Sequence, residues 1–165
     1  NYNKVMSDED FEWFKNLLVS NQDKRCFVFV HSYIEEDSGD ARDFRENSVF
    51  EDWGVTKTDE FKNLIKQYPN VILFHGHSHI KFECQSLDKS ANYTDKNGFK
   101  SIHVPSLSRP RDIIDNASVD DLLGSQGYIV DVYESCIVLN GIDFTDENKQ
   151  ISIAQYCIDT GTITT

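Results

Sequence analysis

The stretch VILFHGHSHI (residues 71–80) joins four apolar residues to three histidines that stand at alternate positions around a glycine. The whole chain has only five histidines in 165 residues. Imidazole is a poor core side chain because both ring nitrogens need polar partners, but it is a good ligand for a metal ion. The stretch therefore predicts a buried strand with a metal site at its end.

A second apolar run, CFVFV (residues 26–30), leads into His31 in the same way. The spacing of apolar residues from 58 to 68 predicts a helix between the two runs. A strand, a helix and a second buried strand form a βαβ unit with parallel strands and a right-handed crossover. Because parallel strands end at one edge of the sheet, we expect His31 to approach the histidines after residue 74.

The remaining segments predict a single α/β domain of 165 residues. Ser7 and Asp10 form an approximate capping box for a first helix. Alternation from residue 80 to 84 indicates a half-exposed strand, KSIHV (100–104) a further strand, and PSLSRPRD (105–112) a loop. Three apolar runs after residue 126, separated by turn-like segments, predict an antiparallel meander.

Charge and hydropathy exclude some functions. The net charge of −12 argues against binding a nucleic-acid backbone, which requires clustered Lys and Arg. It does not argue against a phosphorylated substrate, because a metal centre can hold a phosphate within an acidic protein. No apolar run approaches the ~20 residues that a membrane helix requires, so we expect no membrane segment.

The four cysteines (Cys26, Cys84, Cys136 and Cys157) are widely spaced and form no CxxC pair. Three of them lie in apolar, strand-like runs, which predicts small buried thiols rather than ligands or disulfides. Reduced structural thiols favour a reducing compartment such as the cytoplasm.

FVFVHSY (27–33), followed by VILFHGHSH (71–79), resembles the C-terminal half of calcineurin-like metallophosphoesterases. In that family a single histidine ends one strand and a GHxH motif ends a later one. The similarity extends to the preceding helix, to SIHVPSLS (101–108) and, more weakly, to the meander. It implies a four-layer α/β/β/α sandwich, of which residues 1–165 would form the C-terminal portion with the βαβ unit and the meander.

The resemblance also implies roles for the histidines. His31 and His77 would bind one metal of a dinuclear centre and His79 the other, with Mn, Fe or Zn as the two divalent ions. Such a centre attacks a phosphate ester with metal-bound hydroxide while both metals polarise the phosphoryl oxygens. We expect His75 to stand one layer behind the ligands, and His103 to be a satisfied core or surface histidine.

This sequence departs from the family in two ways. A proline often follows the lone histidine by two positions, and Tyr33 stands there instead. The family's front half carries Asp-x-His, Gly-Asp and Asn-His motifs, none of which occurs in residues 1–30, ahead of His31. We therefore expect residues 1–165 to be the back half of a phosphoesterase, without catalytic residues of its own and inactive alone. A homodimer or a retained N-terminal half would then cover an exposed sheet edge.

Several alternatives stay open at the level of sequence. Arg109 and Arg111 are candidates for contacting a substrate phosphate, and solvated loop residues are the other interpretation. The chain could be a non-catalytic interaction or scaffold module that keeps the fold. It could also be a mononuclear metal protein, which would need a carboxylate near the histidines. The structural alternative is a set of loop histidines bonded to backbone carbonyls.

Overall fold

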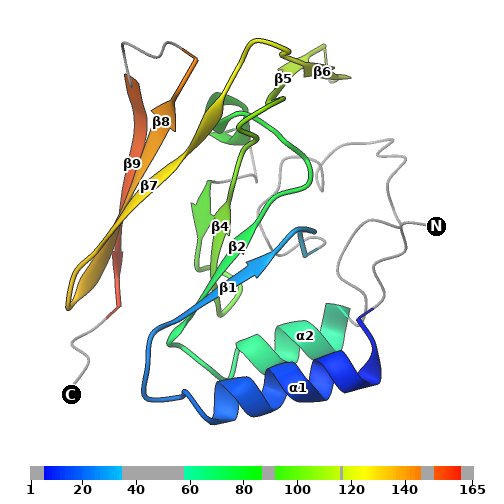
Figure 1. The fold of residues 1–165 in the computed structure, drawn as a ribbon, viewed down its shortest axis with the longest axis vertical. Coiled ribbons are helices and arrows are strands. Elements are labelled where there is room, and N and C mark those ends of the chain that lie inside the picture. Colours follow the sequence, from blue (N-terminus) through cyan, green and yellow to red (C-terminus); the bar gives the residue numbers. More distant parts are fainter. Residues whose placement is uncertain (1–5, 35–57, 87–91, 116, 146–150, 161–165) are drawn as a thin grey trace.

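The computed structural model describes residues 6–34, 58–86, 92–115, 117–145 and 151–160 of the chain (Figure 1). The elements, in chain order, are α1 (Asp8–Val19), β1 (Cys26–Val30), α2 (Thr58–Ile65), β2 (Val71–His75), the 3₁₀ helix η1 (Phe82–Ser86), β3 (Tyr93–Thr94), β4 (Lys100–His103), β5 (Arg111–Ile114), β6 (Ala117–Asp120), β7 (Gln126–Val132), β8 (Cys136–Asp143) and β9 (Ile151–Asp159). The fold is mixed α/β, as the sequence predicts.

The first sheet has the strand order β1-β2-β4-β3. β1 and β4 both run parallel to β2, and β3 joins β4 in the antiparallel direction. The register places Val30 opposite His75, and His75 opposite His103. Three strands therefore end together at one edge of the sheet, which confirms the predicted parallel βαβ arrangement.

One face of this sheet is covered by the two helices (Figure 1). Val71 and Leu73 of β2 join a core with Phe14 of α1 and Phe61 of α2. The rings of Phe14 and Phe61 stack with their centroids 5.5 Å apart. Both helices carry their apolar residues at the spacing that turns one stripe inward, which is why they lie flat on the sheet.

The other face of the sheet packs against a second sheet of β7, β8 and β9, an antiparallel meander in that order. Ile72 and Phe74 of β2 meet Ile137, Leu139 and Ile158 of the meander in this second core. All five residues of β2 are buried, because the strand has a core on each side. The described residues thus build three layers: helices, a four-stranded sheet and a three-stranded sheet.

The predicted start of α1 is confirmed. The Ser7 hydroxyl accepts a hydrogen bond from the Asp10 backbone at 3.0 Å, and the Asp10 carboxylate accepts one from the Ser7 backbone at 3.2 Å. These two bonds satisfy donors that the first turn of a helix leaves open. Neither described helix has both the length and the apolar character needed to cross a membrane.

Two predictions about local structure are wrong. The segment after Ile80 is not a strand but η1, which begins with a hydrogen bond from the Cys84 backbone to the Lys81 carbonyl at 3.1 Å. The cysteines are reduced, as expected, but none is fully buried, and Cys157 is exposed on the meander. Alternation along one strand cannot tell which face a second layer will cover, and in β9 the thiol lies on the uncovered face.

The aromatic stack between the helices should carry much of the stability. We expect Phe61→Ala to lower the free energy of unfolding by about 3–5 kcal/mol, because it empties a fully buried site against Phe14. Leu123→Ala, at a side chain that is 85% exposed, should change it by no more than about 0.5 kcal/mol. Urea unfolding monitored by circular dichroism measures both, and equal effects would contradict this placement of the core.

Candidate metal centre

The candidate site lies where β1 and β2 leave the sheet side by side. The Gly76 backbone donates a hydrogen bond to the His31 carbonyl at 3.2 Å, which ties the two exits together. Nε2 of His31 lies 2.8 Å from Nδ1 of His77, with the ring planes 75° apart. Two ring nitrogens at this distance share one proton. Tetrahedral coordination at about 2.05 Å needs nitrogens about 3.3 Å apart, so a metal could replace that proton after a shift of about 0.5 Å.

The backbone of the turn is strained at two of its histidines. His77 has φ 73° and His79 has φ 62°, and the only other described residue besides glycine with positive φ is Asp115. The left-handed region costs an ordinary residue roughly 1–2 kcal/mol relative to the right-handed one, although histidine tolerates it better than most. Strain of this kind concentrates at functional sites, where the surrounding structure enforces it.

Gly76 is required by close approach rather than by its own conformation. A Cβ built on it would lie 3.2 Å from the Val104 carbonyl oxygen and 3.9 Å from that of His31. Val104 in turn donates a backbone hydrogen bond to His75 at 2.7 Å. The turn is therefore seated between the ends of β1 and β4, and a side chain at position 76 would force them apart.

Two buried histidines lie beneath the turn. His75 and His103 are 1% and 0% exposed, and their rings are 5.6 Å apart. Nε2 of His103 lies 3.1 Å from the hydroxyl of Ser78, which is also fully buried. Burial, and then the neighbouring His75, holds the pKa of His103 well below its usual value, so the ring is neutral. His103 is thus a core histidine, and Ser78 connects the turn to it.

His79 is half-buried, and its buried Nδ1 has no hydrogen-bond partner among the described residues. Partial burial, followed by the positive charge of Arg111, lowers the pKa of His79. A neutral ring with an unsatisfied buried nitrogen is the state in which imidazole binds a metal. Within the described part of the chain, however, no three His, Cys, Asp or Glu side chains are close enough to hold one ion. His79 is therefore a donor separate from the His31–His77 pair.

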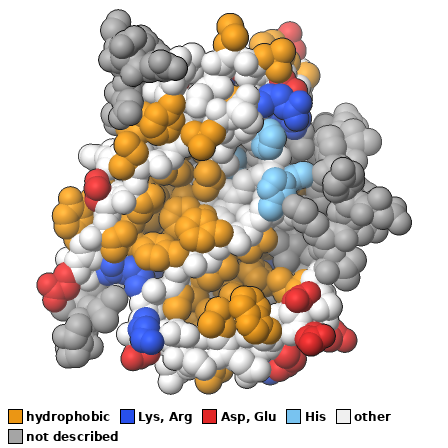
Figure 2. All heavy atoms as spheres, in the orientation of Figure 1, with side chains coloured by type: hydrophobic (Ala, Val, Ile, Leu, Met, Phe, Trp, Pro, Cys, Tyr) orange, Lys and Arg blue, Asp and Glu red, His pale blue; other side chains and the backbone are white. Residues whose placement is uncertain are grey.

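The two predicted arginines lie next to this turn. The Arg111 backbone donates to the His79 carbonyl at 2.7 Å, so the start of β5 runs alongside the turn. Nε of Arg111 lies 2.6 Å from an Asp120 oxygen, and Nε of Arg109 lies 3.6 Å from the other. The hydrogen bond from Arg111 is the main reason that the pKa of Asp120 is lowered. Figure 2 shows basic side chains directly beside the histidines.

Asp120 is a residue that sequence reasoning missed. It stands far from the GHSH motif in the chain, inside a short exposed strand, and only the β5–β6 pairing brings it opposite Arg111.

Tyr33 occupies the position at which the family often has a proline. Its side chain is 3% exposed, and its ring lies 6.4 Å from that of His77. It forms part of the wall beside the His31–His77 pair.

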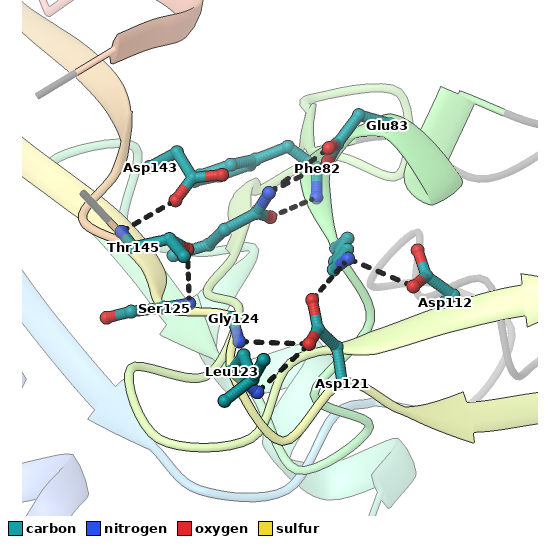
Figure 3. A network of polar contacts seen from close by, with 11 residues as sticks. Phe82, Glu83, Asp112, Asp121, Leu123, Gly124, Ser125, Asp143 and Thr145 are labelled. Carbon is teal, nitrogen blue, oxygen red and sulfur yellow. Dashed lines mark hydrogen bonds and ion pairs between the residues drawn. The ribbon is translucent and has the colours of Figure 1, made fainter. Parts of the chain in front are cut away.

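A polar network anchors the segment that follows the turn (Figure 3). Nζ of Lys81 lies 2.8 Å from Asp121 and 3.0 Å from Asp112. Partial burial disfavours the charge on Lys81, but the hydrogen bonds to Asp121 and Asp112 outweigh it and raise the pKa. The Gln126 side chain accepts from the Phe82 backbone at 3.0 Å. The β5–β6 hairpin and the start of β7 are thus fixed to the histidine turn.

Comparison with protein-family models finds no match, and no curated protein matches the sequence.

The strain in the turn makes a prediction about glycine. Both His79→Gly and His79→Ala remove the imidazole, but only glycine adopts φ 62° without a steric penalty. We expect the glycine variant to be more stable than the alanine variant by about 1 kcal/mol or more in urea unfolding. At His31, which lacks a positive φ, the same pair should show the opposite order. An alanine variant at 79 as stable as the glycine variant would refute the strain.

Proposed function

We propose that the chain is the C-terminal portion of a calcineurin-like metallophosphoesterase domain, a class of enzymes that hydrolyse phosphate esters at a dinuclear metal centre. The observation that carries the proposal is the meeting of His31 and His77, whose facing ring nitrogens are 2.8 Å apart at the shared end of two parallel strands. The family pattern of a lone histidine and a GHxH motif places its ligands at such strand ends. The strained backbone of the motif supports a functional rather than a structural role.

The donor set fits such a centre in part. His31 and His77 would hold one ion and His79 the second, with His75 supporting the turn from below. When bound, the two ions would supply an activated water and polarise the phosphoryl oxygens. Imidazole donors suit Zn and Fe, and they bind Mn less tightly unless carboxylates are added. Arg109 and Arg111 would orient phosphate oxygens, since guanidinium groups bind them through paired hydrogen bonds.

The three histidines provide neither a carboxylate to lie between the two ions nor a general acid to protonate the leaving group. Two divalent ions repel each other strongly unless an anionic ligand lies between them. The carboxylate of Asp120 is engaged by Arg111 at 2.6 Å. In line with the family pattern, we propose that these groups belong to a polypeptide segment outside residues 1–165. The complete domain would then be a four-layer α/β/β/α sandwich.

A non-catalytic scaffold that keeps this fold is the second candidate. The observation in its favour is that no three potential ligands converge within the described residues. A scaffold would keep the strand-end geometry, but its metal affinity would not rise when the segment from outside residues 1–165 is added. Metal affinity therefore separates the two candidates more directly than the fold does.

We expect the isolated chain to bind one Zn²⁺ or Ni²⁺ through the His31–His77 pair, because a metal can replace the proton that the two nitrogens share. Titration calorimetry should show a loss of affinity of about tenfold or more in either His31→Ala or His77→Ala. The matched control is Cys136→Ala with Cys157→Ala, which removes the thiols of the meander and should leave binding unchanged. Binding that depends on the thiols and not on the histidines would contradict the proposed site.

We expect no hydrolysis of bis(p-nitrophenyl) phosphate or p-nitrophenyl phosphate by this chain alone with Mn²⁺, Zn²⁺ or Ni²⁺. A missing general acid and a missing bridging ligand each remove a factor of about 10² or more from the rate. The rate of hydrolysis is measured by the absorbance of released nitrophenolate, with His77→Ala as the baseline. Turnover by the wild-type chain that disappears in His77→Ala would show that residues 1–165 already contain a complete centre.

A further inference from the structure

β1 is an outer strand of its sheet: within the described residues it pairs with β2 and with no other strand. Its five residues extend over about 17 Å and carry backbone N–H and C=O groups that point away from β2. Proteins usually protect such an edge with charged residues, proline or a bulge. CFVFV contains none of these, so the sequence of β1 leaves its outer edge open to pairing.

A groove of about 510 Å³ runs along this strand and is walled by α1. Trp13 and Leu17 of the helix are among the residues that line it, together with residues 27–32 of β1 and the segment that follows. Trp13 is 64% exposed and Phe29 is 74% exposed. Figure 2 shows hydrophobic side chains gathered over this part of the surface, with a hollow between them. An apolar surface of this kind next to an open strand edge marks an interaction site.

We propose that this groove binds an extended polypeptide segment from outside residues 1–165, which adds a strand to the outer edge of β1. A lipid or a small apolar ligand could cover Trp13 and Phe29, but it could not pair with the backbone groups of the strand. A peptide strand does both, because its backbone bonds the edge while its side chains alternate between the two flanking surfaces. Both flanks are apolar, so the segment has apolar residues on both of its faces.

Charge adds a second requirement to the segment. The first turn of α1 is acidic, with Asp8, Glu9 and Asp10, and Asp10 lines the groove. Figure 1 shows that α1 begins on the same side of the molecule on which β1 ends. The segment should therefore carry Lys or Arg where it passes this turn. The net charge of −12 for the whole chain favours the same choice.

The edge and the groove exist whether or not His31 binds a metal, so the inference does not depend on the proposed function. The test starts from a phage library of random nine-residue peptides, selected on the intact chain and counter-selected on Phe29→Lys. Selected peptides are synthesised and titrated against Trp53→Phe, in which Trp13 is the single tryptophan and reports binding by a blue shift of its fluorescence.

We expect mostly apolar peptides with a basic end, whose affinity falls as salt is added. Phe29→Lys should weaken them by about tenfold or more. The matched control Leu123→Lys makes the same change at an exposed leucine outside the groove and should leave affinity unchanged. N-methylation of alternate peptide amides should abolish binding in one register and be tolerated in the other, since only one edge of the peptide faces β1.

Three results would overturn the inference. One is a selection that enriches no peptide for the wild-type chain over Phe29→Lys. Another is binding that survives N-methylation in both registers, which would make the groove an apolar pocket without strand pairing. The third is a dimer of the wild-type chain in sedimentation velocity that dissociates in Phe29→Lys, which would make a second copy of this chain the occupant.

Discussion

The register between β1 and β2 is the constraint on which the candidate site depends. Because the strands are parallel and Val30 lies opposite His75, the residues that follow each strand leave the sheet at the same height. This brings His31 next to the GHSH turn, although the two are far apart in the chain. A shift of one residue would reverse which side chains face the helices and which face the meander, so the two apolar cores hold the register in place.

The candidate site contains features that destabilise the folded state, and the surrounding structure compensates for them. The turn holds two histidines at positive φ, and two more imidazoles are buried below it. These features oppose folding, and β2 compensates for them because it is buried on both faces. The hydroxyl of Ser78 and the close approach of Val104 to Gly76 then leave the turn little freedom. The strained element is held by a rigid one, which is the arrangement that a precise ligand geometry needs.

Charge is distributed unevenly in this acidic protein. Beside the histidine turn, Arg109 and Arg111 contact Asp120, and Lys81 contacts Asp112 and Asp121, so these described charges balance. At the start of α1, three carboxylates follow one another in the chain. The acidic turn of α1 and the net charge of −12 therefore favour the same partner, a cationic segment at the groove.

The sequence by itself determined the elements whose signals are local or periodic: the capped helix that starts after Ser7, the two apolar strands, the meander, and the meeting of His31 with the GHSH turn through the handedness rule for βαβ units. The tertiary structure alone decided the rest. Residues 82–86 form η1 instead of a strand because Lys81 pairs with Asp121, next to the hairpin, and the Phe82 backbone donates to Gln126 of β7. Asp120 reaches Arg111 only through strand pairing. The spacing of apolar residues predicts which face of an element is apolar. Contacts between segments distant in the chain decide which other element covers that face.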